Sequence, residues 1–329
     1  MIAILSGIKD KLSLLLVLSI VGGLFFGYNN DMRFLKPLVA YLLFLMIYPM
    51  MITLSIEEVV KSFRDWKAIG LSLAINFIFA PAVALALGKL FFSNEPMLFT
   101  GLMLMAILPT SGMTASWTGL SGGNLKLSLV MMSVNLIAAA FLLPLYLNFF
   151  VSDVAVVDTG MVFTSVLKVV LIPLLLGDAT RRLIIKKYGK SKYKGLKPAL
   201  GGASSIGVVS VVFIAVALKS PAIIGQWTLA LRTLVPVVML YVMILAISHI
   251  LGSKLLSVED SLALVYSTTM RNLTIALGIL MVAFGESLAV FLLALAYMVQ
   301  VPLAAGYMKL IKFADERKRI KMSLEVGNV

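Results

Sequence analysis

Long apolar runs separated by short polar breaks dominate the sequence. Ten of these runs are about as long as the roughly 20 residues that a helix needs to cross the hydrocarbon core of a membrane. Lipid supplies no hydrogen-bond partner to a backbone, and the runs are too long for barrel strands, so we predict helices. The predicted spans cover residues 12–28, 36–55, 68–92, 97–119, 127–150, 161–180, 199–218, 228–251, 261–283 and 287–311.

The composition is typical of a protein that lies mostly in lipid. Hydrophobic residues make up 61% of the 329 positions and charged residues only 13%, whereas soluble domains carry about 25% charged residues. We therefore expect a single integrated membrane domain and no separate soluble domain. The chain has no cysteine and one histidine, His249, which excludes disulfides, thiolate metal sites and a His cluster. No span supplies a carboxylate pair or a nucleophile beside a base, so we predict that the protein is not an enzyme and needs no cofactor.

The basic residues predict how the spans face. The net charge is +13, with 28 Lys and Arg against 15 Asp and Glu. If the N-terminus is cytoplasmic, the outer segments hold only Arg33, Lys36, Lys89 and Lys219, and the inner segments hold most of the others. This asymmetry follows the positive-inside rule, so we predict a multi-pass protein of the cell membrane with both termini cytoplasmic. Because topology explains the basic surplus, we expect the lipid bilayer, and no nucleic acid, as a partner.

The spans divide into two sets of five. Residues 150–160 carry two acids and no base and lie at the middle of the chain. We therefore predict one repeat over residues 1–155 and a second over residues 156–329. An odd number of spans in each half makes the second enter the membrane from the opposite side, which gives inverted repeats. Related polar interruptions in the fourth and ninth spans, PTSGMTASW (109–117) and STTMRNLT (267–274), support this division.

These two interruptions are the main candidates for chemistry inside the membrane. Pro109 removes a backbone donor and Gly112 loosens the helix, so freed carbonyls and amides could bind an ion or a substrate. A packed Ser/Thr/Gly interface with a proline kink is the other interpretation of the first interruption. The candidate residues are Thr110, Ser111, Thr114 and Ser116 in the fourth span and Ser267, Thr268, Thr269 and Asn272 in the ninth.

Arg271 is the sharpest single feature of the sequence. It falls at a similar depth in the ninth span, and no Asp or Glu lies clearly inside any predicted span. A guanidinium within the membrane needs a partner or a water-filled cavity. Its partners could be carbonyls of the broken helices, water, or an anion that comes from outside the protein. A permanent pairing with carbonyls and the binding of an anion both remain open at this point.

Other polar residues within spans complete the set of candidates. Taken alone, each is more often an interhelical hydrogen bond than a ligand. They are Asn76 in the third span, Ser128, Ser133 and Asn135 in the fifth, and Gln300 in the tenth.

Several motifs together resemble the bile acid:sodium symporter family, whose superfamily also contains arsenite exporters of the arsenical-resistance type. They are Asn76-Phe-Ile-Phe-Ala-Pro81, Pro109-Thr-Ser-Gly-Met-Thr-Ala-Ser116 followed by Gly122-Gly-Asn124, and Thr269-Met-Arg-Asn272. The likeness covers nearly the whole chain. It implies an all-α polytopic protein of ten transmembrane helices in two inverted repeats, with broken helices 4 and 9 crossing in a core domain. Helices 1, 2, 6 and 7 are expected to form a panel domain beside it, with substrate bound between the two.

The chain departs from the sodium-coupled members of that family. Their helix-9 Glu and Gln, which are sodium ligands, correspond to Ser267 and Arg271 here. A guanidinium about 4 Å from Na⁺ costs about 4 kcal/mol at an effective dielectric constant of 20. The resemblance leaves Ser128, Thr114 and Thr268 as a residual sodium site, with Arg271 in place of a cation. No metal site is certain, and Na⁺ stays open as a coupling ion.

The first functional hypothesis is a secondary active transporter of a small organic anion, either a carboxylate or a bile-acid-like molecule. An arsenite or antimonite efflux transporter is the alternative, although the arsenite branch usually has a helix-4 cysteine that is absent here. A passive channel or a membrane receptor is a third class. The sequence leaves substrate, direction, coupling ion and the choice between monomer and homodimer open.

Overall fold

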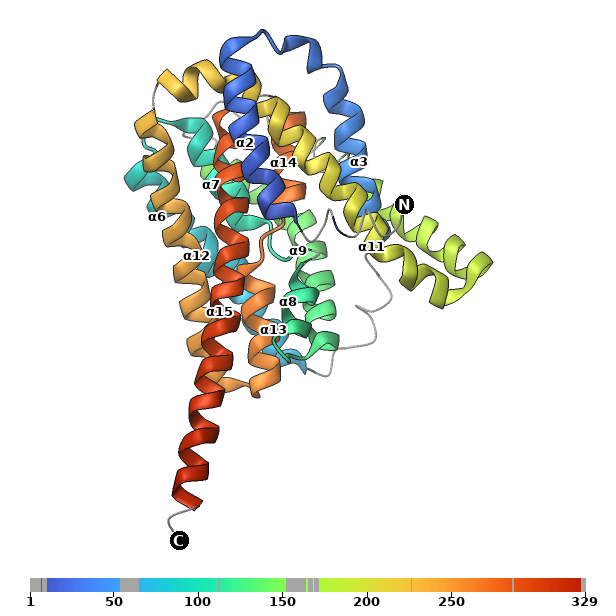
Figure 1. The fold of residues 1–329 in the computed structure, drawn as a ribbon, viewed down its shortest axis with the longest axis vertical. Coiled ribbons are helices and arrows are strands. Elements are labelled where there is room, and N and C mark those ends of the chain that lie inside the picture. The colour runs from blue at the N-terminus through green and yellow to red at the C-terminus, as the bar shows by residue number, and fades with distance from the viewer. Residues whose placement is uncertain are drawn as a thin grey trace.

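The protein, seen in a computed structural model, is built of helices with no strand over the residues that the structure describes (Figure 1). These residues are 11–53, 65–111, 113–151, 172–225, 227–285 and 287–326, with the single residues Gly7, Thr164 and Lys168. Within them, 6 helical segments are long and apolar enough to cross a membrane, and shorter apolar helices accompany them. The chain is thus a polytopic membrane protein. The predicted repeat boundary at residues 155–156 and much of the predicted span 161–180 lie outside the described residues.

The elements follow the apolar runs along the chain. The first part contains α2 (Leu12–Asn29), a short 3₁₀ turn η1 (Arg33–Leu35), α3 (Leu38–Ile52), α5 (Trp66–Ala74), the π-helical η3 (Ile75–Phe79), α6 (Ala80–Phe91), α7 (Pro96–Ile107), α8 (Thr114–Leu120) and α9 (Leu125–Val151). The second part contains α11 (Ile172–Gly225), α12 (Trp227–Leu255), α13 (Val258–Thr269), α14 (Leu273–Ala283) and α15 (Leu288–Val326).

Helix starts and stops have local causes. Pro96 is the first residue of α7, where its missing N–H costs nothing. Ser257 caps α13 by accepting a hydrogen bond from the Asp260 amide, and Glu259 and Asp260 place negative charge in the first turn. α15 continues to Val326, well beyond the predicted end of the tenth span at residue 311.

The helices pack in two groups. α2 and α3 lie mainly against the long α11, and we name these three helices the panel. We name α5 to α9 with α12 to α15 the core, in which α13 packs on α12 and α15 packs on α7. In Figure 1 the blue α2 and α3 lie beside the yellow α11, whereas the orange and red C-terminal helices lie with the cyan and green helices.

Side-chain hydroxyls tie the panel helices to one another. Ser19 of α2 donates to the carbonyl of Val209 over 2.6 Å, and Ser220 donates to the carbonyl of Leu24 over 2.6 Å. Tyr193 donates to the carbonyl of Ile52 over 3.0 Å. Each bond joins two panel helices, so the panel is held together by its own contacts.

Glycine allows the closest approach within the panel. A Cβ added to Gly207 of α11 would lie 2.6 Å from the backbone nitrogen of Met46 in α3, a distance that real Cβ atoms do not tolerate. The two backbones can therefore pack at this distance only while residue 207 has no side chain.

We expect Gly207→Ala to lower the free energy of unfolding by about 1–3 kcal/mol, because the extra methyl group forces α11 away from α3. Gly70→Ala is the matched control, since nothing lies within 4 Å of that added Cβ and alanine is the better helix former by about 1 kcal/mol. Thermal unfolding of the two variants in detergent measures the difference. Equal melting temperatures would contradict the close packing described.

Candidate functional site

The two broken helices pair with each other at their breaks. The amide of Ser111 donates to the carbonyl of Met270 over 3.0 Å, and the amide of Asn272 donates to the carbonyl of Leu108 over 2.9 Å. These reciprocal bonds run as in a short antiparallel pair of strands. One freed donor and one freed acceptor of each break are thus satisfied by the other, as a non-helical segment inside a membrane protein requires.

The first break begins at a proline and contains a strained residue. Leu108, which precedes Pro109, leaves the helical region with φ −97° and ψ 83°, as a residue before proline tends to do. Thr110 has a φ of 55°, a conformation that is rare for a β-branched residue. Its hydroxyl is hydrogen-bonded to the carbonyls of Pro109 (2.8 Å) and Met132 (3.3 Å). The Met132 contact fixes the break against α9.

The second break is shorter and is closed by a cap. α13 ends at Thr269 and α14 begins at Leu273. The side chain of Asn272 accepts a hydrogen bond from the Ile275 amide over 3.2 Å and so caps α14. Asn272 is therefore a structural cap in this arrangement, and Arg271 lies in the break itself.

Arg271 is fully buried at this crossing, with 0% of its surface exposed. Its Nη1 donates to the side-chain oxygen of Asn76 over 3.1 Å and to the carbonyl of Ala106 over 3.0 Å. Its Nε and Nη2 have no hydrogen-bond partner among the described residues. The guanidinium therefore has neutral partners on one side and an unpaired edge on the other.

Asn76 is held in a polar network of the core. It lies in η3, a π-helical turn of the kind often found at functional sites. Its amide nitrogen lies 3.3 Å from the Ser72 hydroxyl and 3.4 Å from the Ser267 carbonyl. Asn135 of α9 donates to the same Ser72 hydroxyl over 2.8 Å. Ser72 was not among the predicted residues, and a lone serine in an apolar run gives no signal of this role.

Gln300 holds the backbone of the second break. Its side-chain oxygen accepts from the Arg271 amide over 2.7 Å and from the Tyr241 hydroxyl over 2.8 Å. Its Nε2 has no partner among the described residues. Tyr241 is fully buried and was also missed by the sequence, because only the packing of α12 against α15 brings it to Gln300.

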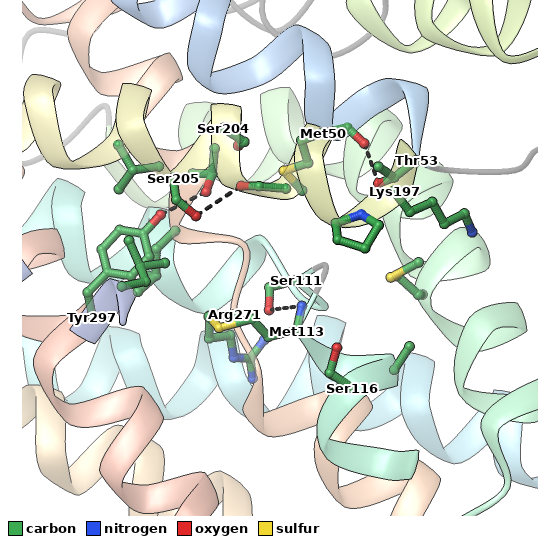
Figure 2. Close-up of a pocket in the computed structure, with 18 of the residues that line it drawn as sticks. Met50, Thr53, Ser111, Met113, Ser116, Lys197, Ser204, Ser205, Arg271 and Tyr297 are labelled. Atoms are coloured by element: carbon green, nitrogen blue, oxygen red, sulfur yellow. Dashed lines mark hydrogen bonds between the residues drawn. The ribbon is translucent and has the colours of Figure 1, made fainter. Parts of the chain in front are cut away.

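A cavity of about 260 Å³ lies between the panel and the core (Figure 2). Of the predicted residues, Ser111, Ser116 and Arg271 line it. Figure 2 shows these three on the side opposite Ser204 and Ser205 of α11. Polar lining residues outside the predicted set are Thr53, Lys197, Ser204, Ser205, Thr274 and Tyr297. The stretch GGASS at 201–205 inside an apolar run was the available signal for two of them.

The remaining predicted residues lie away from the cavity wall. Ser128 is bonded to the Thr118 hydroxyl over 3.1 Å, and Thr268 to the Ser248 hydroxyl over 2.6 Å. Ser133 donates to the carbonyl of Leu129, one turn earlier in its own helix. The hydroxyls of Thr114, Ser267 and Thr269 are buried without a partner in the described part of the chain.

The described residues contain no group of three or more acidic, His or Cys side chains that could hold a metal ion. The three residues of the predicted residual sodium site, Ser128, Thr114 and Thr268, offer hydroxyl oxygens only. The structure gives Ser128 a partner on α8 and Thr268 a partner on α12. The residual sodium site stays a prediction.

Comparison with known proteins bears on this arrangement. The sequence model of the sodium bile acid symporter family matches residues 40–227. Over 265 residues the chain is 26% identical to the arsenical-resistance protein Acr3 of Corynebacterium glutamicum, a match that covers 76% of this chain and 71% of that protein. It is 25% identical over 299 residues to an uncharacterized transporter of Synechocystis, covering 83% and 78% of the two chains. It is also 27% identical over 253 residues to the probable chloroplastic sodium/metabolite cotransporter BASS2 of Oryza sativa subsp. japonica, covering 75% and 54%.

We expect Gln300→Leu to destabilise the protein by roughly 2–4 kcal/mol, because it leaves the buried Arg271 amide and the Tyr241 hydroxyl without an acceptor. Tyr241→Phe is the matched control, since it removes one donor and leaves the Arg271 amide bonded, and we expect it to cost about 1 kcal/mol. Denaturant unfolding in detergent micelles gives both values. A Gln300→Leu variant no less stable than Tyr241→Phe would show that Gln300 does not hold the break.

Proposed function

Because the chain belongs to the sodium bile acid symporter family, we propose that it is a secondary transporter that carries a small organic anion across the cell membrane by alternating access. The observation that carries the proposal is the state of Arg271. Its charge is buried at the wall of a cavity between two helix groups, its partners are neutral, and two of its nitrogens are unpaired among the described residues.

The unpaired edge of the guanidinium has a donor pattern that suits a carboxylate. Both nitrogens are buried in this state, so we propose that they become accessible when the panel and the core move relative to each other. The N–H groups on Nε and Nη2 lie side by side and form one of the two forks with which arginine binds a carboxylate through two parallel bonds. The N-terminus of α14 adds to this preference, since Leu273 and Thr274 of its first turn line the same cavity. Helix N-termini carry partial positive charge and free amides, so both groups favour an anion.

The size of the cavity favours a small substrate. Sites for drug-sized ligands usually enclose about 300–1,000 Å³, and this cavity is about 260 Å³. A short carboxylate fits such a volume better than a molecule of bile-acid size.

The panel wall adds a second preference. Thr53 and Ser205 donate their hydroxyl protons to carbonyls of their own helices, over 2.7 Å and 2.9 Å. Ser204 of α11 donates to the carbonyl of Met46 in α3. Their oxygens then offer lone pairs to the cavity. A substrate that carries a hydroxyl group beside its carboxylate would satisfy the donors of the core wall and the acceptors of the panel wall together.

Alternating access needs two bodies that move against each other around a site. We propose that the panel and the core are these bodies, that the chain has ten spans with both termini cytoplasmic, and that residues 1–155 and 156–329 are inverted repeats. The reciprocal bonds between the two breaks support this pairing of halves, since each half contributes one donor and one acceptor. Arg271 supplies a fixed positive charge at the crossing, so we propose that uptake of the anion does not need Na⁺.

We expect Arg271→Gln to reduce carboxylate uptake at least tenfold, because an attraction of about 4 kcal/mol between unit charges 4 Å apart is lost. Uptake of radiolabelled lactate, propionate and taurocholate is measured in proteoliposomes, with Na⁺ and with Na⁺ replaced by choline. Lactate should be carried best, and the replacement of Na⁺ should have no effect.

Arg232→Gln is the matched control, because Arg232 is exposed on α12 and donates one long hydrogen bond of 3.4 Å to the Phe91 carbonyl. Uptake that survives Arg271→Gln would remove the anion site from the proposal. Uptake that requires Na⁺ would remove the claim that Arg271 stands in for a cation.

A second candidate is efflux of arsenite, which the similarity to arsenical-resistance proteins favours. The chain contains no cysteine, so a thiolate cannot be the ligand. Hydroxyl groups of the cavity and the Arg271 edge would have to bind the uncharged acid through hydrogen bonds. This requirement makes the arsenite role the weaker fit to the cavity.

Growth of an arsenite-sensitive bacterial host tests the second candidate. If the protein exports arsenite, expression of the wild-type chain should raise the inhibitory arsenite concentration above that of the empty vector, and Arg271→Gln should lower it again. We expect no increase, since the chain has no cysteine and the cavity therefore has no thiolate. Clear tolerance would replace the organic anion as the leading substrate.

A further inference from the structure

A strongly basic segment precedes the cavity-lining part of α11. Residues 179–197 contain eight basic side chains and no acidic one. The chain reverses at Gly189, whose φ is 82°, so the segment is a helical hairpin. We name residues 179–197 the basic hairpin. In Figure 1 it projects sideways from the bundle beside the label α11, as a segment would that lies in the plane of a membrane surface.

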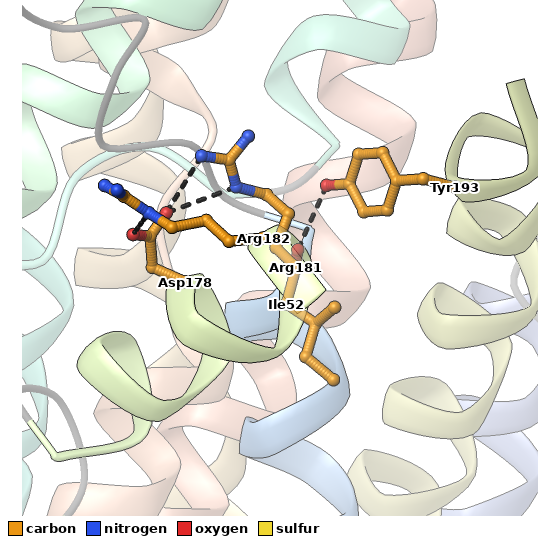
Figure 3. Close-up of polar contacts among 5 residues, drawn as sticks. All are labelled: Ile52, Asp178, Arg181, Arg182 and Tyr193. Atoms are coloured by element: carbon orange, nitrogen blue, oxygen red, sulfur yellow. Dashed lines mark hydrogen bonds and ion pairs between the residues drawn. The ribbon is translucent and has the colours of Figure 1, made fainter. Parts of the chain in front are cut away.

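The base of the hairpin is braced by an ion-pair cluster (Figure 3). Asp178, which is buried, accepts from Arg181 over 3.0 Å and from Arg182 over 2.7 Å. Tyr193, also buried, donates to the Ile52 carbonyl at the end of α3. One carboxylate thus offsets part of the charge at the base, and Tyr193 braces the hairpin against α3.

The tip of the hairpin combines exposed lysines with exposed apolar side chains. The exposed lysines are Lys186, Lys187, Lys190, Lys192 and Lys194. The ammonium groups of Lys187 and Lys192 lie 5.3 and 5.0 Å from the centre of the Tyr188 ring, which is 50% exposed. Leu183 is 66% exposed on the same hairpin. Lysines beside an aromatic ring, with an exposed leucine on the same hairpin, match the boundary between headgroups and acyl chains.

We propose that the basic hairpin binds the phosphate headgroups of anionic phospholipids and thereby fixes the panel at the membrane surface. Charge complementarity identifies the partner, because a run of basic residues without one acid beside a membrane span attracts acidic headgroups. Tyr188 and Leu183 distinguish a lipid from a free anion, since each gains from contact with acyl chains. A role in guiding substrate into the cavity fits less well. Among the eight basic residues of the hairpin, only Lys197 lines the cavity.

The test compares two variants that each lose four positive charges. The hairpin variant carries Lys187→Gln, Lys190→Gln, Lys192→Gln and Lys194→Gln. The control variant carries Arg33→Gln, Lys36→Gln, Lys89→Gln and Lys219→Gln, on the segments predicted to face the other side. The apparent melting temperature of the full chain in neutral detergent is followed while phosphatidylglycerol, phosphatidylcholine or inorganic phosphate is added, because a ligand of the folded state raises it by mass action.

We expect phosphatidylglycerol, and not phosphatidylcholine or phosphate, to stabilise the wild-type chain and the control variant. The hairpin variant should need at least tenfold more phosphatidylglycerol for the same increase, since each surface lysine contributes roughly a fivefold factor in binding. The hairpin variant should match the wild type before lipid is added, because its four substituted side chains are exposed.

Three results would overturn the proposal. An equal response of the two variants to phosphatidylglycerol would place the lipid site elsewhere. Stabilisation by inorganic phosphate as strong as that by the lipid would identify a free-anion site. The third result is a hairpin variant that responds normally to lipid but whose carboxylate uptake no longer depends on ionic strength. It would show that the lysines attract the substrate and do not bind lipid.

Discussion

Two helices can be interrupted inside this bundle because their backbones pair with each other. An unsatisfied amide or carbonyl in an apolar environment costs several kcal/mol, and the breaks free such groups on both helices. The bonds from Ser111 to Met270 and from Asn272 to Leu108 satisfy one donor and one acceptor of each segment. They also keep Thr110 in a conformation that costs about 1–3 kcal/mol. The cavity wall, the N-terminus of α14 and the position of Arg271 all depend on this crossing.

The charge of Arg271 is tolerable because the core surrounds it with neutral oxygen atoms. An arginine at the centre of a membrane span costs about 2.5–3.5 kcal/mol on insertion scales. Hydrogen bonds to a charged group contribute about 1.5–3 kcal/mol each, so the two bonds from Nη1 to Asn76 and Ala106 are of the same size as that cost. No acid is needed to keep the residue in place. The donors on Nε and Nη2 remain unpaired among the described residues. They add nothing to the stability of the fold, so stability alone does not explain them.

The sequence predicted the membrane class and the places where helices break, because both depend on local properties. Apolar length predicts spans, and Pro109 and the polar residues around Arg271 mark interruptions. It did not predict the partners of those residues. Ser72, Tyr241 and Tyr297 are single polar residues in apolar runs, and only the packing of distant helices brings them to Asn135, Gln300 and Thr274.

Several residues that were predicted to bind a ligand have structural partners instead. The identity of a residue alone does not determine which face of a helix it occupies. Asn272, expected to bind a ligand, caps α14. Ser128 and Thr268, expected together, have partners on different helices, α8 and α12. By contrast Ser204 and Ser205, which line the cavity, lie in α11 and were not among the candidates. Hydroxyl residues are too common in membrane helices for type and spacing to separate packing from binding.

If the protein works by the proposed alternating access, selection of charge and movement of the panel are controlled by different walls of the cavity. Arg271 is fixed to the core by Asn76, Ala106 and Gln300, so its attraction for an anion changes little when the panel shifts. A ligand can bias a conformational equilibrium only through contacts that differ between the two states. Those contacts must therefore come from the panel wall, where Ser204 and Ser205 face the cavity. In the proposed transport cycle, the core therefore determines which molecules bind, and the panel hydroxyls determine whether binding favours one orientation of the site.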